Sequence, residues 1–168
     1  MRGGPNGERE RIRKDVQEAD LGLPGINALF DRFAELQDRP RPALIHSDFN
    51  AGQVMVSDNA IAYVVDWDFA QHGRPMRDLG LCIAYTKFYH HSDERAAALR
   101  QAYQHIRWLS PEDTEECTLW EIYTLLRVTS AQHLAGGIEN SVRGVRLIRD
   151  AIAHLGPESP NGTAQVQP

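Results

Sequence analysis

The sequence predicts a mainly helical α+β domain in which a small β hairpin carries a polar loop. Apolar residues recur at helical spacing both before residue 40 and after residue 76. Between these segments, two β-rich runs flank Asp58 and Asn59, a pair that favours a tight turn. Acidic and amide side chains stand at the ends of the β-rich runs, and they are the first place to look for chemistry.

The composition is that of one ordinary globular domain. Of 168 residues, 42% are hydrophobic and 24% are charged, and the formal net charge is −5. That charge argues against nucleic acid or an anionic membrane as the main partner. No apolar run approaches the roughly 20 residues that span a bilayer, and no signal peptide is evident, so we expect a cytoplasmic protein. Cys82 and Cys117 are expected to be reduced and buried.

The N-terminal part predicts two helices. Residues 1–7 are Gly-rich and are expected to be disordered. Residues 8–20 are highly charged with a thin apolar stripe, which favours an amphipathic helix. Residues 24–38 place several large apolar side chains on one helical face, and the prolines that follow end this second helix.

The next segment predicts β structure. Residues 43–45 form a short apolar strand, and residues 53–57 and 60–65 form the two arms of a hairpin. Gln53 begins one arm and Asp66 follows the other. Folding the chain back at the turn therefore brings these two side chains to the same open end.

The rest of the chain predicts four helices and a tail. Ser92 or Asp93 can cap one helix, and Ser110 followed by Pro111 and acidic residues is a strong start signal for another. The helices are expected at residues 76–90, 93–108, 111–134 and 138–155, and residues 156–168 are expected to be disordered. Residues 8–155 therefore form the one predicted folded domain.

Polar side chains gather around the predicted strands. Asp48 follows the first strand, two residues after His46 and five before Gln53, and Asp66 has Asp68 beside it. We expect these three carboxylates and one amide to converge. Oxygen-rich clusters suit Mg²⁺, which takes one or two protein oxygens plus phosphate oxygens, and a carboxylate outside the metal shell can deprotonate a hydroxyl. A solvated turn residue is an equally good interpretation of any single acid, so the arrangement carries the hypothesis.

These residues resemble a known catalytic core. "HSDFNAGQVMV" and "YVVDWDFAQHGRPMRDLG" are similar to the core of the aminoglycoside phosphotransferase and choline kinase-like superfamily, which has a protein-kinase-like fold. The usual pattern there is His-Gly-Asp-x-x-x-x-Asn, a hairpin, then Ile-Asp-Trp. The resemblance is specific over residues 43–80 and extends more loosely, as a helical C-terminal lobe, to about residue 155.

The resemblance implies ATP- or GTP-dependent and Mg²⁺-dependent phosphoryl transfer to the hydroxyl of a small molecule. By this likeness Asp48 would accept the hydroxyl proton or position the acceptor. Gln53 and Asp66 would coordinate Mg²⁺, with Asp66 bridging it to the nucleotide phosphates. His46 would brace the loop, and Asp78 would hold the loop and cap the next helix.

The likeness also raises weaker substrate candidates. Asp68 could face metal or substrate, or it could be solvated. In the aminoglycoside enzymes, acids on C-lobe helices bind the cationic drug. The acids of this chain that could do the same are Glu112, Asp113, Glu116 and Glu121. For most of them, an acidic helix start is the simpler interpretation. Aminoglycosides, choline-like alcohols, sugars and homoserine-like acceptors all stay open.

Two departures separate the chain from the family pattern. Gln53 stands where Asn is usual, and Ser47 replaces Gly, which matters if that position needs a positive φ. In addition, only two helices are predicted before His46, so the β-rich small lobe that holds ATP is not recognisable. The chain is therefore expected to resemble the C-terminal lobe alone.

Two alternative functions stay open, and the departures favour the first of them. The first is a non-catalytic kinase-fold fragment that acts as a binding or interaction module. An apolar face on the hairpin, where the small lobe would sit, could drive pairing with a second copy or a partner chain. The second is a metal-dependent hydrolase that uses Asp48, Asp66 and Asp68.

Overall fold

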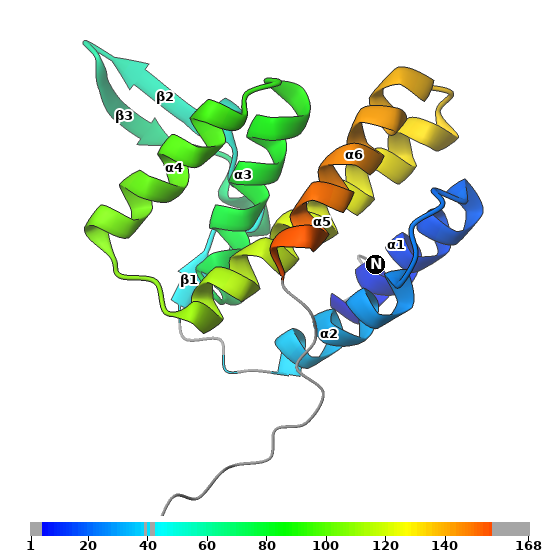
Figure 1. The fold of residues 1–168 in the computed structure, drawn as a ribbon. Coiled ribbons are helices and arrows are strands. Elements are labelled where there is room, and N and C mark those ends of the chain that lie inside the picture. The colour runs from blue at the N-terminus through cyan, green and yellow to red at the C-terminus, as the bar shows by residue number, and fades with distance from the viewer. Residues whose placement is uncertain (1–4, 39, 41–42, 156–168) are drawn as a thin grey trace, which may run out of the picture.

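The computed structural model describes residues 5–38, 40 and 43–155, which form six α-helices and two small antiparallel sheets (Figure 1). The helices are α1 (Pro5–Ala19), α2 (Ile26–Asp38), α3 (Met76–Tyr89), α4 (Asp93–Ile106), α5 (Pro111–Leu134) and α6 (Ile138–His154). The strands are β1 (Ala43–Ile45), β2 (Val54–Ser57), β3 (Ala60–Val64) and β4 (Gln71–Gly73). This mainly helical α+β fold confirms the predicted fold class and is consistent with a kinase-like C-terminal lobe.

Helix α5 is the central element of the fold. Helices α1, α3 and α6 pack around it (Figure 1), and its residues 116–126 are all buried. A helix surrounded by other helices must be apolar nearly all round, which explains why α5 shows no strong one-sided pattern. Its start is the capping box that the sequence predicts: Ser110 Oγ accepts a hydrogen bond from Asp113 N, and the Asp113 carboxylate accepts from Ser110 N.

Helices α3 and α5 approach closely at Gly80. A Cβ atom at this position would lie 2.5 Å from the backbone carbonyl oxygen of Cys117 and 2.8 Å from Cβ of Trp120. Only a residue without a side chain fits between the two backbones. The expected state of the cysteines is confirmed, because Cys82 on α3 and Cys117 on α5 are free thiols and both are buried.

The predicted hairpin is confirmed. β2 and β3 pair antiparallel with Val54 opposite Val64 and Met55 opposite Tyr63, and the hairpin extends away from the helices (Figure 1). Asp58 and Asn59 form the turn, with φ values of 51° and 60°. Two consecutive left-handed residues match the right-handed twist of a hairpin.

The second sheet is a feature that the sequence did not predict. β1 pairs antiparallel with β4, so that Ile45 lies opposite Gln71. The pairing of β1 with β4 brings together the two ends of the segment that runs through the polar loop and the hairpin. Both ends of the polar loop region are thereby fixed at the base of α3.

Several predicted boundaries move in the structure. α1 begins at Pro5, so residues 5–7, which were expected to be loose, form its first turn, where a proline is well tolerated. α2 begins at Ile26, two residues after the predicted start. Residues 1–4 and 156–168, which were expected to be disordered, lie outside the described residues. Over the ranges described above, no helix has both the length and the apolar character needed to cross a membrane.

Candidate functional site

His46 joins the two segments that carry the predicted site residues. Its side chain is buried, and Nε2 lies 2.8 Å from the backbone oxygen of Val65, just beyond β3. Its ring packs against Trp67 at a centroid distance of 4.8 Å and against Phe49 at 5.8 Å. The loop after β1 and the segment after β3 are therefore held side by side through one imidazole ring.

Asp78 holds the same loop from the opposite side. It lies in the first turn of α3, and its two carboxylate oxygens accept hydrogen bonds from His46 N at 2.7 Å and Ser47 N at 2.8 Å. Bonds from backbone N–H groups to a carboxylate are roughly twice as strong as neutral ones. No side-chain hydrogen bond caps the start of α3. The side chain of Asp78 therefore binds the loop and does not cap its own helix.

Ser47 adopts a backbone conformation that favours glycine. Its φ is 70°, in the left-handed region, and its side chain is buried. Its Oγ accepts a hydrogen bond of 3.0 Å from Gln71 Nε2, on β4. The position that carries Gly in the resembled pattern does need a positive φ here, and the Gln71 contact partly offsets the strain of a Cβ.

Asp48 lies half-buried beside α3. Its Oδ1 is 3.5 Å from the hydroxyl of Tyr85, and Arg127 on α5 also donates a hydrogen bond to that hydroxyl. Burial raises the pKa of Tyr85, with Arg127 opposing that effect and the Asp48 carboxylate adding to it. No local pattern in the sequence connects Tyr85 and Arg127 with the loop, because Tyr85 follows Asp48 by 37 residues and Arg127 follows Tyr85 by a further 42.

Gln53 presents an amide oxygen without a partner. It ends a short 3-10 turn, Ala51–Gln53, that begins where the Asn50 side chain accepts a hydrogen bond from Gly52 N. Both the backbone N–H and the backbone carbonyl of Gln53 are hydrogen-bonded: Gln53 N donates to Asn50 O at 3.1 Å, and Gln53 O accepts from Val65 N at 2.9 Å. Its Oε1 is buried and has no hydrogen-bond partner among the described residues. Such an atom calls for a ligand or water.

Asp66 and Asp68 are both exposed beside this loop. Asp66 has φ 65° and ψ 52°, precedes the short turn Trp67–Phe69, and makes no side-chain capping bond to it. Its neighbours Val65 and Trp67 both contact His46. The fold thus brings the backbone at Asp66 close to the loop that carries Asp48.

The expected convergence of three carboxylates is not found. Within the part of the chain that the structure describes, no three His, Cys, Asp or Glu side chains are grouped so that they could hold a metal ion. Asp48, Asp66 and Asp68 therefore do not form the three-acid centre that the hydrolase interpretation needs. What the fold brings together is the backbone of Gln53 and that of Val65, which precedes Asp66, through the bond from Val65 N to Gln53 O. One or two protein oxygens are enough for Mg²⁺ when phosphate and water supply the other ligands.

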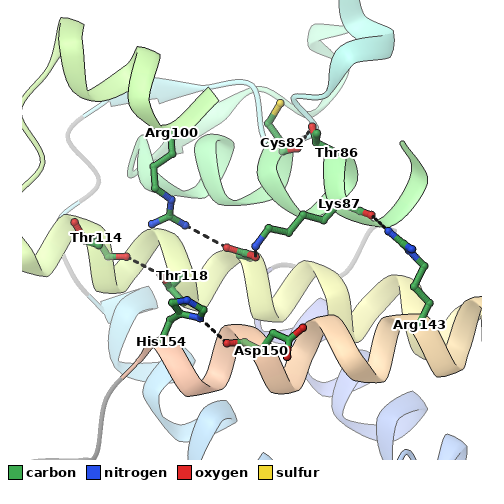
Figure 2. A network of polar contacts seen from close by, with 10 residues as sticks. Cys82, Thr86, Lys87, Arg100, Thr114, Thr118, Arg143, Asp150 and His154 are labelled. Carbon is green, nitrogen blue, oxygen red and sulfur yellow. Dashed lines mark hydrogen bonds and ion pairs between the residues drawn. The ribbon is translucent and has the colours of Figure 1, made fainter. Parts of the chain in front are cut away.

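Glu121, one of the weaker substrate candidates, is engaged inside the protein. It is buried on α5 and pairs with Lys87 Nζ of α3 at 2.7 Å and with Arg100 of α4 at 3.2 Å. Figure 2 shows Lys87 and Arg100 reaching toward the same place from two different helices. A buried carboxylate with two cationic partners ties three helices together and is not available to a cationic substrate.

The other acids of this group also lie in structural contacts or at a helix start. Glu116 is buried and pairs with Arg74 Nε at 2.5 Å. Asp113 belongs to the capping box with Ser110. Glu112 is exposed in the first turn of α5. These placements favour the helix-start and ion-pair interpretations over contacts with a substrate.

The comparison with protein families agrees with the loop geometry. The family model described as a phosphotransferase enzyme family (APH) matches residues 2–120, a partial-length domain that includes Asp48, Gln53 and Asp66. No curated protein and no solved structure gives a significant match. Because the family match spans well over half of the 168 residues, the chain belongs to the phosphotransferase enzyme family.

Proposed function

We propose that the chain is a cytoplasmic small-molecule kinase, which uses Mg²⁺ and transfers a phosphoryl group from ATP or GTP to a substrate hydroxyl. The observation that carries this proposal is the buried, unpartnered Oε1 of Gln53. The backbone of Gln53 joins the loop that carries Asp48 to the segment that carries Asp66. The chain that contains this atom belongs to the phosphotransferase family. A neutral amide oxygen held out of water is a fitting ligand for a hard cation.

The chain's own residues would act mainly by positioning. Asp48 would orient the acceptor hydroxyl and take its proton, while Gln53 and Asp66 would hold Mg²⁺. Mg²⁺ bound there would supply neutralisation of phosphate charge. His46 and Asp78 keep the loop in place through three hydrogen bonds to backbone groups. Holding reactants in one geometry is a large part of catalysis in phosphoryl transfer.

The test is nucleotide binding to the purified chain, measured by calorimetry with and without Mg²⁺. We expect Mg²⁺-dependent binding of ATP or GTP that is weakened by Gln53→Leu and by Asp66→Asn. Gln101→Leu is the matched control, because Gln101 is exposed on α4, away from the loop. Absence of Mg²⁺-dependent binding at millimolar nucleotide, or equal binding by all variants, would refute the proposal for this chain.

A second candidate function is an interaction module, and the exposed hairpin favours it. Large apolar side chains on β2 and β3 are open to solvent: Met55, Val56, Ile61 and Tyr63 are between 51% and 71% exposed. A two-stranded hairpin is marginal alone, and exposed apolar side chains that gather on one element favour an interaction site. Here a second copy or a partner chain would cover the hairpin.

Sedimentation of the chain over a range of concentrations tests this candidate for a second copy. Pairing through the hairpin predicts a dimer that Ile61→Lys abolishes. Ile106→Lys is the control, because Ile106 is 90% exposed at the end of α4. A monomer at every concentration, or equal loss of the dimer in both variants, would argue against self-association through the hairpin.

A further inference from the structure

Three groups from three elements form a directed chain of hydrogen bonds that ends on Asp48. Arg127 of α5 donates to the hydroxyl of Tyr85 of α3, and that hydroxyl lies 3.5 Å from Asp48 Oδ1. α3 and α5 pack along each other (Figure 1), so the bond from Arg127 to Tyr85 links two packed helices. The nucleotide-side residues Gln53 and Asp66 take no part in it.

The direction of these bonds is fixed by chemistry. A guanidinium only donates, an ionised carboxylate only accepts, and a phenol has one proton to give. Because Arg127 occupies the acceptor side of the Tyr85 oxygen, the single phenolic proton is left for Asp48. A cation on the acceptor side also polarises the O–H bond and makes it a better donor.

Contacts to its ring, in addition to those of its hydroxyl, hold Tyr85 in place. The Arg127 guanidinium carbon lies 5.9 Å from the centre of the Tyr85 ring, and the ring of Tyr89 packs against that of Tyr85 at a centroid distance of 5.6 Å. Burial, the largest effect, raises the pKa of Tyr85, so the phenol stays protonated and can donate at neutral pH. Arg127, Asp48 and Tyr89 are the charged and titratable groups that act on it.

We propose that Tyr85, fixed by Arg127, is a positioning residue that holds the Asp48 carboxylate in one orientation for the acceptor hydroxyl. The role of Tyr85 rests on the proposed function, whereas the contacts among Arg127, Tyr85 and Asp48 do not depend on it. The structure places the Tyr85 hydroxyl within hydrogen-bonding distance of Oδ1 of the Asp48 carboxylate. A directed bond to one carboxylate oxygen favours one rotamer of the Asp48 side chain.

The test follows the Asp48 carboxylate itself, by carboxyl carbon NMR of the full chain at neutral pH, with the signal assigned by Asp48→Asn. Tyr85→Phe removes one hydroxyl and should shift the Asp48 carboxyl resonance, because the carboxylate loses a hydrogen-bond donor. Tyr89→Phe is the matched control and should leave that resonance in place. An unchanged Asp48 resonance in Tyr85→Phe would overturn the inference.

Arg127→Met tests whether the guanidinium acts through the phenol. We expect it to shift the Asp48 carboxyl resonance as well, and we expect the double variant with Tyr85→Phe to shift that resonance no further than Tyr85→Phe alone. Additive shifts of the resonance would show that Arg127 acts on Asp48 directly and would overturn the proposed role of the phenol. Where turnover is measurable, Tyr85→Phe should lower kcat about tenfold with little change in the KM for nucleotide.

Failure of this inference and failure of the proposed function are distinguishable. The Asp48 carboxyl resonance is measured without nucleotide, so its response to Tyr85→Phe stands even if the chain binds neither ATP nor GTP. Conversely, Mg²⁺-dependent nucleotide binding together with an Asp48 resonance that does not respond to Tyr85→Phe would retain the kinase proposal and remove only the role of Tyr85 and Arg127.

Discussion

The contact between Asp78 and the loop can be tested by removing one carboxylate. Asp78 accepts the N–H groups of His46 and Ser47 at 2.7 and 2.8 Å, and both donor residues are buried. In Asp78→Ala both donors lose their acceptor. Each unsatisfied buried donor costs about 1–3 kcal/mol, and since Asp78 is only half-buried and water can reach part of the gap, we expect a loss of roughly 2–4 kcal/mol in the free energy of unfolding.

Asp78→Asn gives a finer test with almost no change in shape. The amide keeps one oxygen that can accept a single N–H, while its NH₂ group faces the other donor. One hydrogen bond is lost and the survivor is no longer charge-assisted, so the expected loss is about 1–3 kcal/mol. Against a total stability of about 5–15 kcal/mol for a typical domain, this is easily measured.

The assay is urea unfolding followed by far-UV circular dichroism, with hydrogen exchange at the amides of His46 and Ser47 as a local readout. Asp93→Asn is the control, because Asp93 is an exposed acid in the first turn of α4 and tests the helix-dipole effect alone, about 0.3–1 kcal/mol. If Asp78→Asn and Asp93→Asn lose the same stability, and the amides of His46 and Ser47 exchange no faster in Asp78→Asn than in the wild type, then Asp78 does not hold the loop in place.

Three further predictions concern the backbone and the thiols. Ser47→Gly should relieve about 1 kcal/mol of left-handed strain, and Gln71→Ala should destabilise the wild type but not the Ser47→Gly variant, as a double-mutant cycle in urea would show. Gly80→Ala should cost about 3 kcal/mol in thermal unfolding, because the new methyl would meet the Cys117 carbonyl. Burial raises the pKa of Cys82 to about 11 and of Cys117 to about 12, so neither should react with a thiol reagent at neutral pH until the chain unfolds. Since the ordinary value is 9.0, the unfolded chain releases these protons first, and stability should fall as the pH rises from about 9 toward 11 and 12.

Local signals in the sequence were sufficient for most elements. The start of α5 is specified by Ser110, Pro111 and Asp113, because a cap and its partner three residues later satisfy each other's backbone groups. The hairpin follows from Asp58 and Asn59, two residues that tolerate a left-handed backbone. Each of these predictions depends on residues only a few positions apart, which is why sequence reading reached them.

Pairings between distant segments could not be predicted in the same way. β4 consists of Gln71, His72 and Gly73, which show no alternation of apolar residues, and it becomes a strand only because β1 lies beside it. The contact from Arg127 through Tyr85 to Asp48 depends on how α3 packs on α5, which helical periodicity does not determine. Such contacts need the tertiary structure.

Backbone strain gives a further argument about where function lies. Within the described part of the chain, six residues other than glycine have a positive φ. Four have a structural explanation: Asp58 and Asn59 make the hairpin turn, and Asp20 and His91 follow the ends of α1 and α3, where a left-handed residue commonly ends a helix.

The two that remain are Ser47 and Asp66, and neither forms a hairpin turn or ends a helix. They lie on either side of the hydrogen bond from His46 to Val65, and Val65 is in turn bonded to Gln53, whose amide oxygen is buried without a partner. Strain and an unsatisfied polar atom each cost on the order of 1–3 kcal/mol. Other buried side-chain atoms of the described residues, such as Glu116 Oε1 and Trp120 Nε1, also lack a hydrogen-bond partner, but they do not adjoin a strained residue of this kind. The two strained residues and the buried amide oxygen of Gln53 meet at one link between two loops, and this supports the proposed site, because a site holds groups in positions that folding alone would not favour.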